Sequence, residues 1–384
     1  MITAYQNARL VDASGERAGC VYTENGKILR VSEQPCDIAA DRTVDAGGDA
    51  LMPALIDMHT HLRDPGFPEK ETLETGMRAA LHGGYATLCA MANTKPVCET
   101  PTQVEENHTK AEAFRLCRLV QGAAAGVDLL DKMPTDYAAL SRVTRIITND
   151  GNTIFSDAFM RNLLIASREY GFVISTHCQP ERKIVARDIA LLREVGGNLH
   201  VGHISHAETL AMIRSAKAEG LALTCEVTPH HLLGYDCDYR VNPPLRGKKD
   251  VEALIEGVRD GTIDILSTDH APHTPADKQK GMAGISNIDY ALQVYLRVFA
   301  ENDIPLSRLS EMTSYAPAKR LGFSERLLQE GCPADLVLFQ TDCMHTLGCD
   351  TMVSRSRNTP FLGENLRGCV KMTIVEGEIR YEHR

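Results

Sequence analysis

Two histidines and an arginine occupy alternate positions in the segment DMHTHLRDPG, residues 57–66. Residues two apart in an extended strand point to the same side, so His59 and His61 are predicted to share one face. Arg63 continues that face if the chain stays extended. Neutral imidazole is a zinc ligand, and a planar guanidinium can hold a carboxylate with two parallel hydrogen bonds. The segment therefore indicates a metal site beside a group that binds an anion.

Other histidines and aspartates follow further apolar, strand-like segments of the chain. Asp150 lies in TNDG, His177 in ISTHCQPE, His203 in LHVGHISH and Asp269 in LSTDHAPH. Together with the first two histidines they suit a site for two zinc ions, which a carboxylate can bridge. Such a site lowers the pKa of water and supplies hydroxide near neutral pH. The predicted metal ligands are His59, His61, Asp150, His177, His203 and Asp269.

Each of these residues alone has a simpler interpretation. Asp150 can hold a turn, because Asp-Gly is a turn signal, and Asp269 can cap the helix that follows it. The joint pattern favours a site, because each residue falls at the end of a separate predicted strand. His200 is predicted to pack in the core or to support a ligand. For His230 and His231, orienting a ligand and a structural role both remain open.

The middle of the chain alternates strand-like with helix-like segments. Several of the predicted helices end in glycine, as helix C-termini prefer. This alternation predicts an α/β fold, a (β/α)8 TIM-type barrel, whose active site forms at the carboxyl ends of the strands. The predicted strands are residues 54–58, 85–91, 115–122, 143–148, 172–176, 199–205, 221–227 and 263–268. The predicted helices are residues 71–84, 101–114, 157–171, 181–197, 206–220, 249–261, 287–302 and 306–322.

The two ends of the chain have a different pattern, in which apolar and polar residues alternate between Asn-Gly, Gly-Gly and Glu-Gly turn signals. We expect both ends to join in one small β-sandwich domain. The predicted division gives residues 1–52 plus 333–384 to this composite domain and residues 53–332 to the metal-dependent barrel.

Composition narrows the classes of function. The formal net charge is −10 and no basic block occurs, which argues against a nucleic-acid partner. An anionic chain must also supply dedicated cations to hold an anionic substrate. No apolar run approaches the roughly 20 residues that span a bilayer, and no signal-peptide pattern is found. The twelve cysteines form no Cys-x-x-Cys pair, which predicts reduced thiols in the cytoplasm.

At these residues the chain resembles the class I dihydroorotases of the amidohydrolase superfamily, over nearly its whole length. The motifs HLRDPG, NPPLR and DHAPH are specific to dihydroorotases rather than shared by the superfamily. The resemblance implies reversible conversion between (S)-dihydroorotate and N-carbamoyl-L-aspartate in de novo pyrimidine (UMP) biosynthesis. The matching motifs, in family order, are DMHTHLRDPG, AMANTKP, TNDG, THCQPE, HVGHIS, EVTPHH, VNPPLRG, STDHAPHT, GMAGIS, APAKRLG and PADLVL.

The resemblance also implies the roles of the metal ligands. His59 and His61 match the ligands of the first zinc, and His177 and His203 match those of the second, so two Zn²⁺ per subunit are expected. Asp150 stands where most superfamily members bridge their metals with a carboxylated lysine, and class I dihydroorotases resemble this chain in using an aspartate.

The catalytic and substrate-binding roles are carried over in the same way. Asp269 matches the aspartate that binds metal and acts as general base and then general acid, with metal-activated hydroxide as the nucleophile. The implied substrate-binding residues are Arg63, Asn93, Asn242 and His273, together with backbone groups near Ala283 and Gly284.

Two other functions compete with this one. Hydantoinases and allantoinases have a similar barrel but generally carry a lysine at the strand-four position, where VTRIITNDG offers Arg145 and Asp150. An inactive dihydroorotase-like structural subunit would have lost metal ligands, and here all the ligand positions are filled. The resemblance further implies a homodimer that acts on a small molecule and not on a membrane.

The chain departs from the family pattern at three places. Asn149 replaces the first acid of the usual Asp-Asp-Gly, and Ala92 stands where proline is common. The segment between His177 and His203 is shorter than in many class I members, which predicts a trimmed loop near the entrance of the site.

Overall fold

The predicted strand segments form the parallel strands of a barrel in the computed structural model, which describes residues 1–383. The third predicted strand is split in two at Gly122, whose N–H donates to Ala90 O at 2.8 Å. The barrel strands are β6 (Leu55–Thr60), β7 (Tyr85–Ala90), β8 (Arg118–Gln121) with β9 (Ala123–Ala124), β10 (Ile146–Thr148), β11 (Val173–Thr176), β12 (Leu199–Val201), β13 (Leu223–Val227) and β14 (Ile265–Leu266).

The barrel closes between its first and last strands. Strands β6, β7 and β8 pair in parallel, and β9 to β14 pair in parallel in chain order. Thr60 bridges to His270 just after β14, and the N–H of His61 donates to His270 O at 2.8 Å. Because all these strands run in one direction, their carboxyl ends meet at one end of the barrel. The (β/α)8 prediction is therefore confirmed.

The helices begin and end where the sequence supplies caps. Thr72 and Thr100 each form a capping box, and Gly171 and Gly261 end their helices in the left-handed conformation that glycine adopts easily. The predicted helix over 306–322 is interrupted by a π-helical turn. The helices are α1 (Leu73–His82), α2 (Pro101–Phe114), η1 (Val127–Leu129), α3 (Tyr137–Leu140), α4 (Asp157–Tyr170), α5 (Glu181–Val195), α6 (Ala207–Ala218), α7 (Pro229–Leu233), α8 (Lys248–Asp260), α9 (Pro275–Gln279), α10 (Ala291–Glu301), α11 (Leu306–Ser310), η2 (Glu311–Tyr315) and α12 (Ala316–Leu321).

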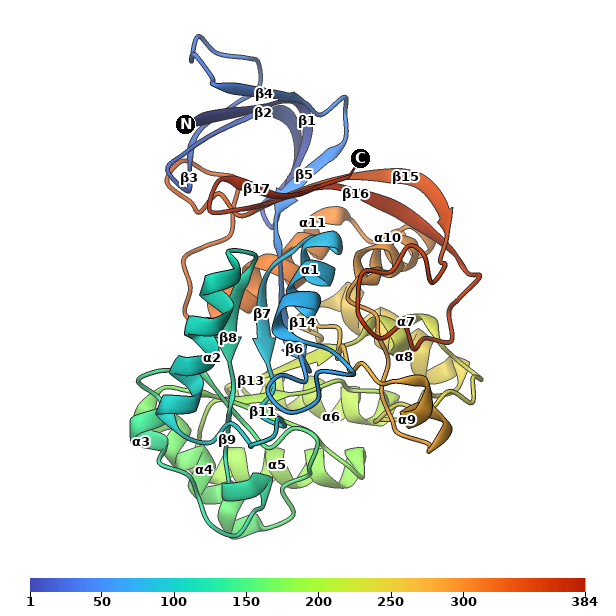
Figure 1. Cartoon of the computed structure of the whole chain (residues 1–384). Coiled ribbons are helices and arrows are strands. Elements are labelled where there is room, and N and C mark those ends of the chain that lie inside the picture. The colour runs from blue at the N-terminus through green and yellow to red at the C-terminus, as the bar shows by residue number, and fades with distance from the viewer. Residues whose placement is uncertain (384) are drawn as a thin grey trace.

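Both chain ends form one sheet at one end of the barrel (Figure 1). The strand order is β17-β16-β15-β5-β1-β2-β3, with β4 paired to β1. The strands from the two chain ends share an apolar core that contains Tyr5, Leu10, Leu338 and Ile374. We propose the division at residues 52 and 332 for these two parts. The strands are β1 (Ile2–Asp12), β2 (Gly15–Glu24), β3 (Lys27–Ser32), β4 (Arg42–Asp45), β5 (Ala50–Pro53), β15 (Leu336–Thr346), β16 (Asn365–Val375) and β17 (Glu378–Glu382).

Candidate active site

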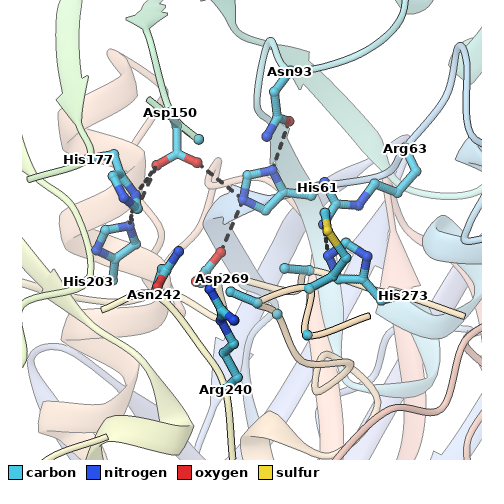
Figure 2. Close-up of a pocket in the computed structure, with 16 residues that line it drawn as sticks. His61, Arg63, Asn93, Asp150, His177, His203, Arg240, Asn242, Asp269 and His273 are labelled. Atoms are coloured by element: carbon cyan, nitrogen blue, oxygen red, sulfur yellow. Dashed lines mark hydrogen bonds and ion pairs between the residues drawn. The ribbon is translucent and has the colours of Figure 1, made fainter. Parts of the chain in front are cut away.

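A cavity of about 360 Å³ opens at the carboxyl ends of the barrel strands (Figure 2). All the metal and substrate residues expected from the sequence line it, except His59, which is fully buried beside it. The lining residues are His61, Arg63, Asn93, Asp150, Gly151, His177, His203, Arg240, Asn242, Asp269, Ala271, His273, Gly281, Met282, Ala283 and Gly284.

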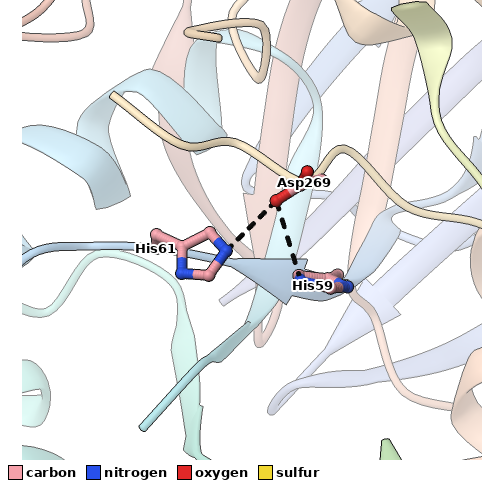
Figure 3. Close-up of side chains that lie close together, drawn as sticks. All are labelled: His59, His61 and Asp269. Atoms are coloured by element: carbon pink, nitrogen blue, oxygen red, sulfur yellow. Dashed lines mark hydrogen bonds and ion pairs between the residues drawn. The ribbon is translucent and has the colours of Figure 1, made fainter. Parts of the chain in front are cut away.

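His59 and His61 converge on Asp269 (Figure 3). His59 lies in β6 and His61 directly follows it, so the alternation of the strand turns both rings to one side. Asp269 Oδ1 lies 3.1 Å from His61 Nε2 and 3.7 Å from His59 Nε2. The three side chains therefore bring two nitrogens and an oxygen to one point.

Asp150 lies between His61 and the pair formed by His177 and His203 (Figure 2). Its Oδ1 is 3.2 Å from His61 Nε2, and its Oδ2 is 3.3 Å from His59 Nε2. The same Oδ2 lies 3.5 Å from His177 Nδ1 and 3.5 Å from His203 Nε2. One carboxylate thus faces all four rings, which is the arrangement a bridging ligand requires.

The neutral imidazoles of this cluster cannot donate a hydrogen bond to every acceptor that their ring nitrogens face. His61 faces Asn93 Oδ1 through Nδ1 at 2.9 Å and Asp269 Oδ1 through Nε2 at 3.1 Å. A neutral imidazole has one N–H, so only one of these contacts can be a hydrogen bond. The buried atoms His59 Nε2 and Asp150 Oδ2 face each other with no hydrogen-bond partner. Such buried polar atoms are costly without a positive charge between them, so the residues fit a divalent metal.

The electrostatics of the cluster point to the same conclusion. Burial raises the pKa of the Asp150 carboxyl, but the neighbouring histidines, His59 first, hold that pKa well below its usual range. For Asp269, burial likewise raises the pKa, and the bond to His61 and the charge of His59 lower it overall. Both carboxylates are therefore ionised near neutral pH, as metal ligands must be.

Arg63 reaches the cavity by a route that the strand pattern does not predict. Strand β6 ends at Thr60, and Arg63 has a left-handed backbone with φ of 59°. The chain is therefore not extended there, and Arg63 does not simply continue the face of His59. Its side chain still lines the cavity, because its Nε donates to Pro272 O at 3.2 Å and its Nη2 to His273 Nε2 at 3.3 Å.

Arg63 and His273 form a wall of the cavity with one fixed charge. Burial lowers the pKa of Arg63 to about 10, which leaves the guanidinium charged at neutral pH. Burial, with the positive charges of Arg63 and Lys70, lowers the pKa of His273 to about 3. The imidazole is therefore neutral, and Arg63 supplies the positive charge that this wall presents to the cavity, which suits a carboxylate ligand.

Comparison with known proteins places the chain in a family. The amidohydrolase family model matches residues 50–380. The dihydroorotase of Clostridium botulinum (strain Eklund 17B / Type B) is 35% identical over 400 residues, covering 98% of each chain. The dihydroorotase of Brevibacillus brevis (strain 47) is 33% identical, again with 98% of each chain covered. The chain belongs to the dihydroorotases of the amidohydrolase superfamily.

Solved structures share the fold. The L-hydantoinase of Arthrobacter aurescens superposes with a TM-score of 0.91 at 24% identity, covering 99% of this chain and 96% of that one. The dihydropyrimidinase of Brevibacillus agri gives a TM-score of 0.88 at 20% identity, covering 99% of this chain and 95% of that one.

No helix within residues 1–383 is long and apolar enough to cross a membrane.

Glu226 is a site residue of the enzyme that sequence reasoning missed. It lies in β13 and is fully buried. Its Oε1 accepts from His59 Nδ1 at 2.6 Å and from the N–H of His203 at 3.3 Å, while its Oε2 pairs with His200 Nε2 at 3.0 Å. It therefore holds the N–H of His59 on Nδ1 and turns Nε2 to the cluster. The sequence feature that could have identified it is a charged glutamate inside the otherwise apolar, strand-like segment LALTCEV.

The adjacent histidines of TPHH are held by protein contacts. His231 contacts Thr228 Oγ1 at 2.7 Å and Pro243 O at 3.0 Å, and His230 Nδ1 lies 3.2 Å from the amide of Asn287. These bonds favour the structural role for His231, while Nε2 of His230 is buried with no hydrogen-bond partner.

Asn149 has a structural reason to depart from the family pattern. Its Oδ1 accepts from the N–H groups of Ala125 and Gly126, both at 3.0 Å, and its Nδ2 donates to Leu129 O at 3.2 Å. An aspartate could accept the first two bonds but could not donate the third. The amide therefore fastens the segment after β9 beside Asp150.

The backbone N–H and carbonyl of Gly284 are already hydrogen-bonded within the protein. Its N–H donates to Arg240 O at 3.2 Å, and its carbonyl accepts from Lys278 Nζ at 2.9 Å and from Asn358 Nδ2 at 3.0 Å. Ala283, by contrast, makes no backbone hydrogen bond within residues 1–383. Of the two backbone sites expected from the sequence, Ala283 is thus the one free to contact a ligand. Arg240, which also lines the cavity, was not anticipated.

Proposed function

We propose that this chain catalyses the reversible hydrolysis of (S)-dihydroorotate to N-carbamoyl-L-aspartate. The observation that carries the proposal is one cavity that joins two features. A wall formed by Arg63 and a neutral His273 offers a fixed positive charge, and a cluster of four histidines and two aspartates faces it. Dihydroorotate has the matching parts, a carboxylate and a cyclic amide.

We propose two Zn²⁺ as the metals of this site. A metal ion held by histidine and aspartate is supported by two clusters of side chains. Within each cluster the ligand atoms lie within 4.8 Å of one another. His59, His61 and Asp269 make up the first, and Asp150 and His203 join His59 in the second. His177, 3.1 Å from His203, completes the donor set. Bound metal would lower the pKa of water and polarise the amide carbonyl.

Asp269 is the proposed general base and general acid. Its carboxylate is ionised and accessible from the cavity, so it can accept the proton of the attacking water. The same oxygen can then deliver that proton to the ring nitrogen as the amide bond breaks. In the reverse direction it removes the proton from the carbamoyl nitrogen.

The remaining cavity residues orient the substrate. Arg63 holds the carboxylate through charge-assisted hydrogen bonds, and His273 contacts it from the same wall. Asn93 keeps its amide Nδ2 available, because its Oδ1 is bonded to His61. Asn242 and the free backbone of Ala283 lie across the cavity, where the ring would be placed.

The experiment that tests this function is a spectrophotometric assay with zinc-loaded protein. Dihydroorotate is compared with hydantoin and allantoin at equal concentrations, and turnover of dihydroorotate alone is expected. The absence of dihydroorotate turnover by zinc-loaded protein would refute the proposal. An inactive structural subunit would in addition bind less than one equivalent of metal, which elemental analysis measures.

We also propose a homodimer in the cytoplasm. The small-molecule substrate follows from the family, and the twelve unpaired cysteines support a reducing compartment. Light scattering of the purified protein at several concentrations tests the dimer, since a constant monomer mass would exclude it.

A further inference from the structure

The connection between β15 and β16, residues 347–364, leaves the terminal sheet and extends down the side of the barrel. Figure 1 shows it in red, descending toward α7 and α9. Hydrogen bonds fix its far end to the barrel. The N–H groups of Val353 and Ser354 donate to Asp289, and Ser354 Oγ donates to the fully buried Glu71. The connection is therefore anchored to the barrel a few residues before Asn358.

Asn358, within this connection, binds the backbone of the cavity wall. Its Oδ1 accepts from the N–H of His273 at 2.9 Å and from Ser286 Oγ at 2.7 Å. Its Nδ2 donates to Gly284 O at 3.0 Å and lies 3.4 Å from Tyr239 Oη. Its own carbonyl accepts from the N–H of Ser286 at 2.9 Å. One side chain thus joins the segment that carries His273 to the segment that carries Gly284.

The two segments that Asn358 joins are in direct contact at the cavity. Gly284 has φ of +144°, and a Cβ there would lie 2.5 Å from Ala271 O and 2.8 Å from His273 Cδ2. The Gly284 backbone is therefore pressed against the imidazole of His273. The position of Gly284 therefore bears directly on the position of the ring that, with Arg63, lines the cavity.

The chemistry of an amide is required at this position. A backbone N–H can only donate and a carbonyl can only accept, so the orientation of the Asn358 amide is fixed by its two backbone partners. Aspartate would keep the acceptor but leave the Gly284 carbonyl facing a carboxylate. Alanine would remove both bonds.

We propose that Asn358 is a positioning residue for substrate binding, which holds His273 and, through Gly284, the adjacent free backbone of Ala283 in the geometry that receives the substrate's carboxylate and ring. The inference rests on the proposed function. It gives the connection between β15 and β16 a part in the affinity of the barrel for its substrate, although Asn358 itself does not line the cavity.

The test compares Asn358→Ala and Asn358→Asp with the matched control Asn365→Ala. Asn365 is an exposed asparagine at the start of β16, and within residues 1–383 its side chain bonds only to Thr346. Each variant is assayed as zinc-loaded protein with dihydroorotate. We expect both Asn358 variants to raise KM about tenfold, with kcat within about threefold of wild type, because lost hydrogen bonds of this kind shift binding by about that factor. Metal content should equal that of wild type, and the control should not change KM.

An unchanged KM in both Asn358 variants would overturn the inference, and so would a joint loss of kcat and metal, which a general structural role would cause. If neither variant folds, Ser286→Ala decides. It removes one bond to Asn358 Oδ1, so we expect KM to rise about twofold to threefold, and no change would overturn the inference. Failure of wild-type protein to convert dihydroorotate would instead refute the proposed function.

Discussion

Three residues of the site have backbone conformations that most residues avoid. Arg63, His203 and Asp269 have φ of 59°, 30° and 44°. A left-handed conformation costs a residue with a side chain roughly 1–2 kcal/mol. At each position the conformation directs the side chain into the cluster or the cavity. The chain therefore accepts local strain where it aims functional groups, a common feature of active sites.

Arg63→Met tests the assignment of the carboxylate-binding group. The methionine fills similar space but carries no charge, so KM for dihydroorotate should rise about 10- to 100-fold, as expected from losing charge-assisted bonds worth ~1.5–3 kcal/mol. Metal content should stay the same, because Arg63 contacts His273 and Pro272 rather than a predicted ligand. Steady-state kinetics and elemental analysis measure both, with the exposed Arg182→Met as control. An unchanged kcat/KM would show that the carboxylate binds elsewhere.

Asp269→Ala tests the proton-transfer role. Removal of a general acid–base group lowers rates about 10²- to 10⁴-fold, and here the same residue is also a predicted ligand, so nearly all activity should be lost. Asp269→Asn is the informative companion, since it preserves the shape but cannot accept the proton. If Asp269→Asn kept more than about a tenth of the wild-type kcat, another group would have to be the base.

At the scale of elements, the sequence was sufficient to predict the features that depend on neighbouring residues along the chain. Strand alternation, helix caps and polar residues at strand ends predicted the barrel and the positions of His59, Asp150 and Asp269. Contacts between distant segments gave no such signal. Glu226 acts from within β13 on a ring 167 positions away, and Asn358 acts 85 positions from His273. Which strand residues point toward the site, and which loop packs against it, depend on tertiary packing. No local sequence pattern specifies that packing.

Glu226→Gln tests whether β13 supports the ligands carried by β6 and β12. The amide would place an N–H₂ group against either His59 or His200, and a donor facing His59 Nδ1 favours the tautomer with its proton on Nε2, toward the cluster. We expect metal affinity to fall about 10- to 100-fold, as is usual when such supporting groups are changed. Metal retained after dialysis against graded chelator measures this. The exposed Glu208→Gln is the control, and equal retention in both would contradict the role of Glu226.

At the scale of the whole molecule, the terminal sheet and the barrel are joined at several points. Strand β5 pairs with both β1 and β15 and leads directly into β6, which carries His59. Arg118 of β8 bonds to Asp335 at 3.2 Å, just before β15. The 347–364 connection reaches the far end of the barrel. The sheet therefore supports the barrel at its amino end and, through this connection, at the site.

Metal removal should lower the stability of the whole barrel. The predicted ligands come from β6 and from the segments that follow β10, β11, β12 and β14, so a metal bound by them links strands around the barrel. A ligand present at 1,000 times its Kd stabilises the folded state by about 4 kcal/mol. For a protein of this size we expect a fall in Tm of roughly 5–10 °C after chelation. Scanning fluorimetry of chelated and zinc-reloaded protein measures the change, and reloading should restore the original Tm. If protein shown by elemental analysis to be metal-free had the same Tm as the loaded form, the four histidines and two aspartates would not hold a metal that stabilises the fold.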